Sequence, residues 1–400
     1  MSPDDRRGEG AAAPPLNPLL VGGAEYPFVA LDRRARELVP PALAAIRFSL
    51  GDPREETPEF IRVALQRAVP VVSSYPAVAG QPELRTAFAG WFARRFGVRL
   101  DPETEMLPAN GTKEAVFLMA FAVVGAGDDP RRTVVVPSPA YPVYEPAARF
   151  AGADVQLVPL RGEDGWRFVP ERVPAEVWRR TALLWLNTPH NPTGAVLDLA
   201  TLERVAALAR RHGFWVVADE AYAELYFDHG PPPSMLECGL ENVVVLHTLS
   251  KRSAMTGYRS GFIAGDPRLI AALRRFRPNA GVATPDFVQS AAIAAWNDDE
   301  HAAAQRARYA AKRALMLGFF GRRGWHVEAS EATFYLWLAA PGGDDVAFVE
   351  RLMRIGLVVL PGSYLGAAGT GYVRFALVPT LAECGEAVRR MEAAGRALET

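Results

Sequence analysis

The chain has 400 residues, half of them hydrophobic, and its 44 basic side chains nearly balance its 45 acidic ones. This composition predicts a soluble globular protein of two or three domains, and the near-zero net charge argues against a dedicated nucleic-acid or membrane-surface binder. Two cysteines cannot form a disulfide framework, which favours the reducing cytoplasm, and six scattered histidines without ligand spacing predict no metal site.

The N-terminal residues 1–20 combine glycine, alanine and proline with charges of both signs. Such a segment predicts a disordered tail, and it lacks the apolar stretch of a secretory signal. No window of about eighteen uninterrupted apolar residues follows, so no membrane span is expected.

Short apolar, β-rich runs then alternate with amphipathic stretches. Runs that are apolar throughout suit strands covered on both faces, and alternation with helices predicts an α/β domain with a mostly parallel sheet. Gly213 provides a helix stop. The expected strands are 133–136, 182–186, 215–218 and 243–246, with 259–264 as a weaker fifth, and the expected helices are 114–124 and 199–212.

The pattern changes after residue 285. Residues 285–320 are alanine-rich and predict either one long helix or two helices broken near 297–299. Segments 326–330, 333–340 and 371–378 then read as strands among shorter helices. We therefore predict a large domain over 48–284 and a smaller α+β domain made of 21–47 with 285–400.

Four polar motifs follow or adjoin the predicted strands. They are Asn-Pro-Thr-Gly at 191–194, Asp-Glu-Ala-Tyr at 219–222, Ser250-Lys251, and Arg259 eight positions after that lysine. Ligands of open α/β sheets gather beyond the carboxyl ends of the strands, so these motifs predict a single site.

The residue types in these motifs suit pyridoxal 5′-phosphate. Lys251 offers an amine for a Schiff base, and Asp219 offers a carboxylate that keeps the pyridine nitrogen protonated. Asn191 and Tyr222 can donate to the phenolic oxygen of the cofactor. Arg259, together with a helix that opens at Asn110-Gly111-Thr112-Lys113, suits the phosphate. Arg374 is flanked by apolar strand residues, which indicates a bound substrate carboxylate.

The stretch His-Thr-Leu-Ser-Lys251 with Arg259-Ser-Gly261, taken with the motifs at 191–194 and 219–222, resembles the class I/II aminotransferases of pyridoxal-phosphate fold type I. The resemblance runs from about Tyr26 to the end of the chain. It implies that Lys251 carries the cofactor and acts as general base and acid, with Asp219 and Tyr222 beside it. It further implies these contacts: Tyr141 on the cofactor ring; Gly111, Thr112, Ser250 and Arg259 around the phosphate; Lys113 and Thr248 elsewhere in the cofactor site; Asn191 on cofactor and substrate; and Gly51 and Arg374 on the substrate carboxylate. Tyr75 would reach the phosphate bound in the neighbouring subunit, which implies a homodimer.

A narrower resemblance, carried by segments such as Ser-Leu-Gly-Asp-Pro at 49–53 and Leu-Pro-Gly-Ser-Tyr at 360–364, is to the bacterial N-succinyldiaminopimelate aminotransferases of lysine synthesis. It implies N-succinyl-L,L-diaminopimelate and 2-oxoglutarate as substrates. We expect the remote substrate groups to meet Arg277, or the segment around Tyr26 and Arg33. The alternatives are an aspartate, aromatic or broad-range aminotransferase, a C–S lyase on the same fold, and a cofactor-binding regulatory module. The last would need a DNA-binding segment, and the sequence offers none.

Overall fold

The structure is a computed structural model that describes residues 14, 16–21, 25–125 and 129–399. The predicted tail, residues 1–20, lies largely outside the described residues. At its end the structure describes a short helix, α1 (Pro18–Val21), and the disordered tail stays a prediction.

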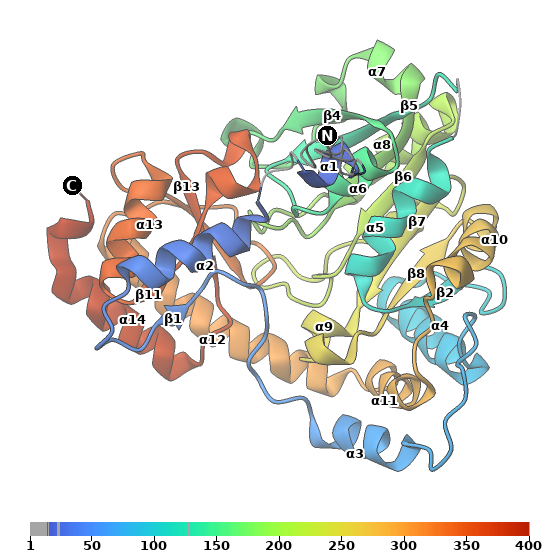
Figure 1. Ribbon diagram of the computed structural model, residues 1–400, viewed down its shortest axis with the longest axis horizontal. Coiled ribbons are helices and arrows are strands. Elements are labelled where there is room, and N and C mark those ends of the chain that lie inside the picture. The colour runs from blue at the N-terminus through green and yellow to red at the C-terminus, as the bar shows by residue number, and fades with distance from the viewer. Residues whose placement is uncertain (1–13, 15, 22–24, 126–128, 400) are drawn as a thin grey trace, which may run out of the picture.

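A seven-stranded sheet forms the centre of the larger half of the molecule (Figure 1). Its order is β2-β8-β7-β6-β5-β3-β4; β3 to β7 run parallel, and β8 is antiparallel to both of its neighbours. The mostly parallel α/β fold expected from the sequence is thereby confirmed. The strands are β2 (Met106–Ala109), β3 (Thr133–Ser138), β4 (Asp154–Pro159), β5 (Thr181–Asn187), β6 (Trp215–Asp219), β7 (Val243–Thr248) and β8 (Gly261–Gly265).

Alternate residues of these strands enter two different cores, one on each face of the sheet. In β5, for example, Leu184 and Leu186 pack into one core, whereas Leu183 and Trp185 pack into the other. One face is covered by α5 (Thr112–Val123), α6 (Tyr144–Phe150) and α10 (Pro267–Phe276), and the other by α4 (Pro82–Phe96), α8 (Leu199–His212) and α11 (Asp286–Trp296).

The five predicted strands correspond to β3, β5, β6, β7 and β8. Two further strands carry weaker signals. The edge strand β4 exposes half of its side chains, so it lacks an apolar run, and β2 has four residues including Pro108.

The alanine-rich region contains two helices rather than one. Between α11 and α12 (Glu300–Arg322) the chain breaks at Asn297–Asp299, as one of the two predicted alternatives has it. The Asp298 side chain accepts a hydrogen bond from the backbone N–H of His301 at 2.9 Å, which satisfies a free donor of the new helix. Figure 1 shows α12 extending from beside α11 toward the C-terminal part of the molecule.

The C-terminal part holds a smaller sheet of order β12-β13-β10-β9, antiparallel throughout, and a parallel pair β1–β11. Three of these strands correspond to the predicted segments. The domain boundaries stay a prediction. The elements are β1 (Ile46–Arg47), β9 (Val327–Glu328), β10 (Tyr335–Ala339), β11 (Leu357–Val358), β12 (Leu360–Pro361) and β13 (Tyr372–Ala376), with α2 (Pro27–Leu38), α13 (Asp345–Arg354) and α14 (Leu381–Ala394). The structure also describes the α-helices α3 (Glu59–Ala68), α7 (Ala175–Arg180) and α9 (Leu249–Arg252).

Among the described helices, none is long and apolar enough to cross a lipid bilayer.

Candidate active site

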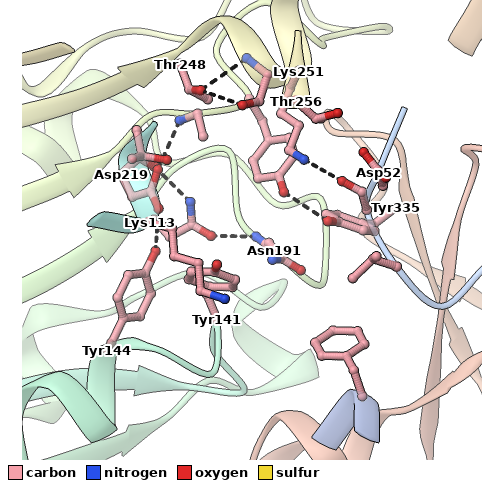
Figure 2. A pocket seen from close by; sticks show the side chains of 18 of the residues that line it. Asp52, Lys113, Tyr141, Tyr144, Asn191, Asp219, Thr248, Lys251, Thr256 and Tyr335 are labelled. Carbon is pink, nitrogen blue, oxygen red and sulfur yellow. Dashed lines mark hydrogen bonds between the residues drawn. The ribbon is translucent and has the colours of Figure 1, made fainter. Parts of the chain in front are cut away.

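A cavity of about 360 Å³ lies where the edge of the large sheet meets the small sheet (Figure 2). Twelve of the predicted site residues line it: Gly51, Thr112, Lys113, Tyr141, Asn191, Asp219, Tyr222, Thr248, Ser250, Lys251, Arg259 and Arg374. The strand-end motifs are therefore brought together.

The sheet topology explains this gathering. Asn187, Asp219 and Thr248 are the last residues of the parallel strands β5, β6 and β7, and Asn187 pairs in register with Asp219. Strand β8 runs the other way, so its first residue, Gly261, pairs with Thr248 at the same edge. Arg259, just before β8, consequently reaches the same edge from an amino end.

Lys251 lies in α9, directly after β7, and its ammonium donates a hydrogen bond to the backbone carbonyl of Gly51. Burial lowers the pKa of Lys251 from 10.5 to about 8; the nearby positive charges of Arg259 and Arg374 act in the same direction, and Asp52 opposes them. A lysine with this pKa holds a usable fraction of neutral, nucleophilic amine near neutral pH.

Asp219 is buried at the end of β6. Its carboxylate accepts hydrogen bonds from the Tyr144 hydroxyl at 2.8 Å and from the backbone N–H of Ala221 at 3.2 Å. Burial raises the pKa of Asp219, and the bond from Tyr144 counteracts this. Over the described part of the chain no lysine or arginine forms an ion pair with it. A buried carboxylate of this kind suits a ligand that brings its own protonated nitrogen.

The amino end of α5 and Arg259 form a cradle for an anion. Gly111 has φ of +73°, and a Cβ there would lie 2.3 Å from a guanidinium nitrogen of Arg259, so only glycine permits this approach. The guanidinium is held by the carbonyls of Thr256 at 2.9 Å and Asn110 at 3.2 Å. The hydroxyl residues Thr112, Thr248 and Ser250 line the same cavity, a donor set that suits a phosphate.

Arg374, on β13, is buried and carries a cation without an anionic partner among the described residues. It donates to the Asn191 side-chain oxygen at 2.8 Å and to the Ser49 carbonyl at 2.5 Å, and its guanidinium lies 4.3 Å from the Tyr335 ring centre. Its Nε has no hydrogen-bond partner within the described ranges of the chain. Since a buried guanidinium favours a carboxylate partner, the cavity suits an acidic ligand.

Aromatic side chains complete the walls. The hydroxyls of Tyr222 and Tyr335 are 2.9 Å apart, and burial raises the pKa of both phenols, which keeps them as neutral hydrogen-bond donors. Tyr141 lines the cavity, and burial raises its pKa as well. A Cβ on Gly51 would meet the Tyr335 hydroxyl at 2.0 Å, so this close approach requires glycine.

Sequence reasoning missed several cavity residues, chiefly Tyr144, Tyr335, Asp52 and Asn187. Tyr144 stands three positions after Tyr141, and this near-helical spacing was the available signal. Tyr335 lies inside the predicted strand segment 333–340, and no signal in the sequence sets it apart from that strand. Asn187 accepts the backbone N–H of Asn191 at 2.7 Å and so orients that residue.

Tyr75 is fully exposed and lies outside the cavity of its own chain, so its contact with a neighbouring subunit stays a prediction. The two arginines predicted to meet the remote substrate groups need correction. Arg277 is buried against Glu114 and the Pro108 carbonyl, so it does not face the cavity. Arg33 is exposed, pairs with Glu25 and does not line the cavity either.

Lys113 is predicted to contact the cofactor, and this stays a prediction. Lys113 lines the cavity (Figure 2), and its ammonium lies 3.5 Å from the Tyr26 hydroxyl.

Comparison with known proteins agrees with this geometry. Residues 44–391 match the family described as aminotransferase class I and II. The LL-diaminopimelate aminotransferase of Gloeobacter violaceus is 38% identical over 379 residues, 92% of this chain and 96% of that protein. An aminotransferase structure from Neisseria meningitidis superposes with a TM-score of 0.88 at 34% identity, covering 94% of this chain and 99% of the other. A probable N-succinyldiaminopimelate aminotransferase from Thermus thermophilus gives 0.84 at 32% identity, covering 92% and 99%.

The lysine, carboxylate and guanidinium at one sheet edge thus occur in a chain that belongs to the class I and II aminotransferase family.

Proposed function

We propose that this enzyme is a pyridoxal-5′-phosphate-dependent transaminase of diaminopimelate, free or N-succinylated, with 2-oxoglutarate and glutamate as the partner pair. The observation that carries the proposal is the convergence of Lys251, Asp219 and Arg374 on one cavity. Each has a charge or proton state that no described protein neighbour fully balances, so a ligand with complementary groups is needed.

The cavity fits the proposed cofactor at both ends. Asp219 forms no ion pair with a lysine or arginine in the described chain and suits the ring nitrogen, whereas Arg259, the hydroxyls and the start of α5 suit the phosphate. When bound, the cofactor supplies an aldehyde for the substrate amine and a ring that withdraws electrons from the α-carbon. Tyr141, on the cavity wall, suits contact with the ring face.

The protein's own residues then have distinct tasks. Asp219 holds a proton at the ring nitrogen, and the Tyr144 hydroxyl fixes the orientation of its carboxylate. Lys251 removes the proton from the substrate α-carbon as a general base and then donates it to a different atom as a general acid. Proton removal requires a neutral amine and therefore a lowered pKa of Lys251. Arg374 binds the α-carboxylate, and its hydrogen bond to Asn191 fixes the guanidinium plane.

A second cation supports a substrate with a remote carboxylate. Lys113 lines the cavity, and its ammonium lies 5.1 Å from the Tyr26 ring centre without an acidic partner in the described chain. Both diaminopimelate and its N-succinyl derivative carry a carboxylate far from the reacting amine. The curated relatives are named for the free compound and one structural neighbour for the succinylated one, so both forms belong to the proposal.

A homodimer is also proposed, with a cytoplasmic location. Val71, Val72 and Tyr75 lie in one segment and are almost completely exposed, at 104%, 81% and 102% of their reference areas. Contiguous exposed apolar side chains favour burial against another subunit. Tyr75 is then available to a neighbouring active site, as the family resemblance implies.

A substrate panel with matched variants tests the proposal. Keto-acid formation should be fastest with one of the two diaminopimelates, and Lys113→Ala should lower kcat/KM for that substrate roughly 10-fold, the effect of one charge-assisted contact. Arg33→Ala is the control, because Arg33 is also near Tyr26 in sequence but is paired with Glu25 outside the cavity. Equal or better turnover of aspartate or phenylalanine would overturn the substrate proposal. Release of thiol and ammonia together with a keto acid, without formation of glutamate from 2-oxoglutarate, would favour a lyase.

A further inference from the structure

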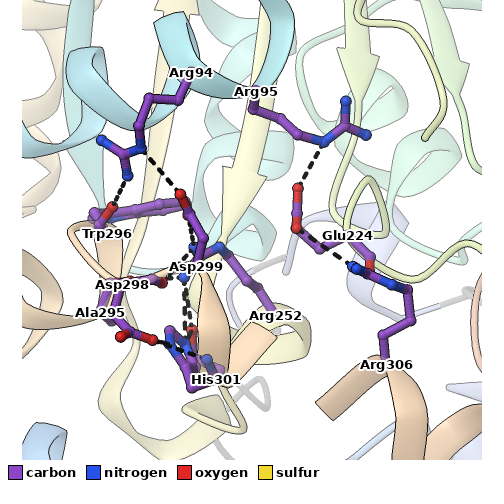
Figure 3. Close-up of polar contacts among 11 residues, drawn as sticks. Arg94, Arg95, Glu224, Arg252, Ala295, Trp296, Asp298, Asp299, His301 and Arg306 are labelled. Atoms are coloured by element: carbon purple, nitrogen blue, oxygen red, sulfur yellow. Dashed lines mark hydrogen bonds and ion pairs between the residues drawn. The ribbon is translucent and has the colours of Figure 1, made fainter. Parts of the chain in front are cut away.

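Arg252, the residue after Lys251, occupies an unusual buried position (Figure 3). Its side chain is 2% exposed and packs at the junction between α11 and α12. The guanidinium donates to the carbonyls of Ala295 at 2.7 Å and Asp298 at 2.8 Å, and to the Asp299 carboxylate at 2.8 Å. One side chain thus joins the end of one helix to the beginning of the next.

These contacts depend on guanidinium chemistry. The planar group presents several donors in fixed directions, so it can satisfy three acceptors at once, whereas an ammonium on a flexible stem cannot do so in the same geometry. The rings of Trp91 and Trp296 lie 5.6 and 5.3 Å from the guanidinium carbon and add cation–π contacts. The position of Arg252 is therefore strongly determined.

The next residue, Ser253, provides a second link. His301, in the first turn of α12, donates from Nδ1 to the Asp298 carboxylate at 2.6 Å, which leaves Nε2 to accept from the Ser253 hydroxyl at 2.8 Å. The turn that carries Lys251 is therefore held to the start of α12 by two consecutive residues.

The same helix reaches the opposite side of the active site. Thirteen residues after Asp299, about 20 Å along the helix, Lys312 forms a buried ion pair with Glu55 and donates to the Leu377 carbonyl at 3.2 Å. Glu55 is in the segment of Gly51, whose carbonyl accepts from Lys251, and Leu377 directly follows the strand of Arg374. α12 thus contacts the Lys251 turn at one end and the Arg374 strand near its middle.

We propose that Arg252 is a positioning residue: it ties the Lys251 turn to the start of α12, so that this helix sets the Lys251 amine relative to the substrate-binding Arg374. This inference rests on the proposed transaminase function. Arg252 is not among the residues that line the cavity, so it acts through Lys251 and not on substrate or cofactor directly. Its role is to keep the amine within reach of the α-carbon.

Arg94 offers a matched control. It donates to the same Asp299 carboxylate at 3.0 Å and to the Trp296 carbonyl at 3.0 Å, but it belongs to α4 and is half-exposed. Replacing Arg94 perturbs the same junction without releasing the Lys251 turn. A purely structural role of the junction would affect both arginine variants alike.

The experiment compares Arg252→Met, Arg252→Lys and Arg94→Met in the full-length enzyme. With the best substrate of the panel, Arg252→Met should lower kcat roughly 10- to 100-fold with KM nearly unchanged, because a displacement of about 1 Å has this effect on an oriented group. Arg252→Lys should recover part of the loss. Arg94→Met should stay within about 2-fold of the parent enzyme.

A second readout does not need turnover. An amine-directed reagent labels Lys251 in the cofactor-free protein, and peptide mass spectrometry gives the labelling rate at each pH. This rate reports the fraction of Lys251 that is neutral. In the parent protein the midpoint of the labelling rate against pH should lie at about 8. In Arg252→Met this midpoint should rise by roughly one pH unit, because the Lys251 turn becomes more exposed to solvent, and in Arg94→Met it should stay unchanged.

Unchanged kcat and an unchanged labelling midpoint in Arg252→Met would overturn the proposal, as would equal losses in the two methionine variants. If Arg252→Met does not fold, Arg252→Lys is compared with Arg94→Lys by the same two measurements. If the parent enzyme transaminates no member of the panel, the labelling midpoint still decides the positioning role, so the two proposals can fail separately.

Discussion

The two sheets supply the active site in different ways. Lys251, Asp219 and Asn191 follow the ends of parallel strands, where topology alone brings successive motifs to one edge. Arg374 and Tyr335 come from within the antiparallel strands β13 and β10, and they reach the cavity only because the small sheet packs against that edge. The first region contains the groups that suit a cofactor, and the second contains the clamp that suits a substrate. Substitutions in the first region should therefore alter the cofactor-binding properties of the substrate-free protein. Substitutions in the second region should leave those properties unchanged.

The largest effect is expected at Asp219. Asp219→Asn should lower kcat about 10³-fold, or about 4 kcal/mol, because an amide cannot hold a proton on the ring nitrogen. Stopped-flow measurement of the first half-reaction checks this, and the absorption spectrum of the cofactor-loaded variant should also change before substrate is added. Near-normal turnover would remove Asp219 from the mechanism.

The next largest effect is expected in the fraction of Lys251 that is neutral at a given pH. With its pKa lowered to about 8, the folded protein should hold roughly 300 times more neutral amine at pH 7 than an ordinary lysine does. Amine labelling of the cofactor-free protein should therefore level off above pH 8, whereas in urea the same residue should titrate near its ordinary value.

The sign of the linked stability follows from proton binding. Between pH 8 and about 10.5 the unfolded chain holds the Lys251 proton and the folded chain does not, so this group makes the free energy of unfolding rise with pH in that window. A labelling midpoint equal in folded and unfolded protein would contradict both statements.

Arg374→Lys tests the other region. Losing the bidentate geometry while keeping the charge should raise KM for every amino acid roughly 30-fold, about 2 kcal/mol. The spectrum and cofactor affinity of the substrate-free enzyme should be unchanged, as measured by equilibrium titration. A change in cofactor affinity as large as the change in KM would break the division between the two regions.

The smallest effect is expected for Tyr144→Phe. Removing one hydrogen bond to the Asp219 carboxylate should lower kcat about 10-fold, roughly 1.4 kcal/mol, and raise the pKa of that carboxyl further, since the bond now opposes the effect of burial. Steady-state kinetics against pH checks this, with Tyr141→Phe as the control, because Tyr141 lines the same cavity but, among the described residues, forms no hydrogen bond with Asp219.

Much of the large sheet could be predicted because its strands are continuous apolar runs, such as Val243–Leu246, and each polar motif follows one of them directly. Its edge strand β4 could not be predicted, since an exposed strand need not be apolar. Arg374 could be singled out in the sequence because it is a charged residue between apolar neighbours. Tyr335 could not, because an aromatic residue in a strand normally indicates packing alone.

The sequence by itself determined the family, the sheet and the identity of the groups that meet at its edge, because these depend on local patterns and on the order of strands. The tertiary structure decided which cations face the cavity. Arg277 is buried against Glu114, Arg33 pairs with Glu25, and Lys113 lies at the cavity wall beside Tyr26. The direction of a long charged side chain depends on distant partners that pay for its desolvation, and no local pattern encodes those partners.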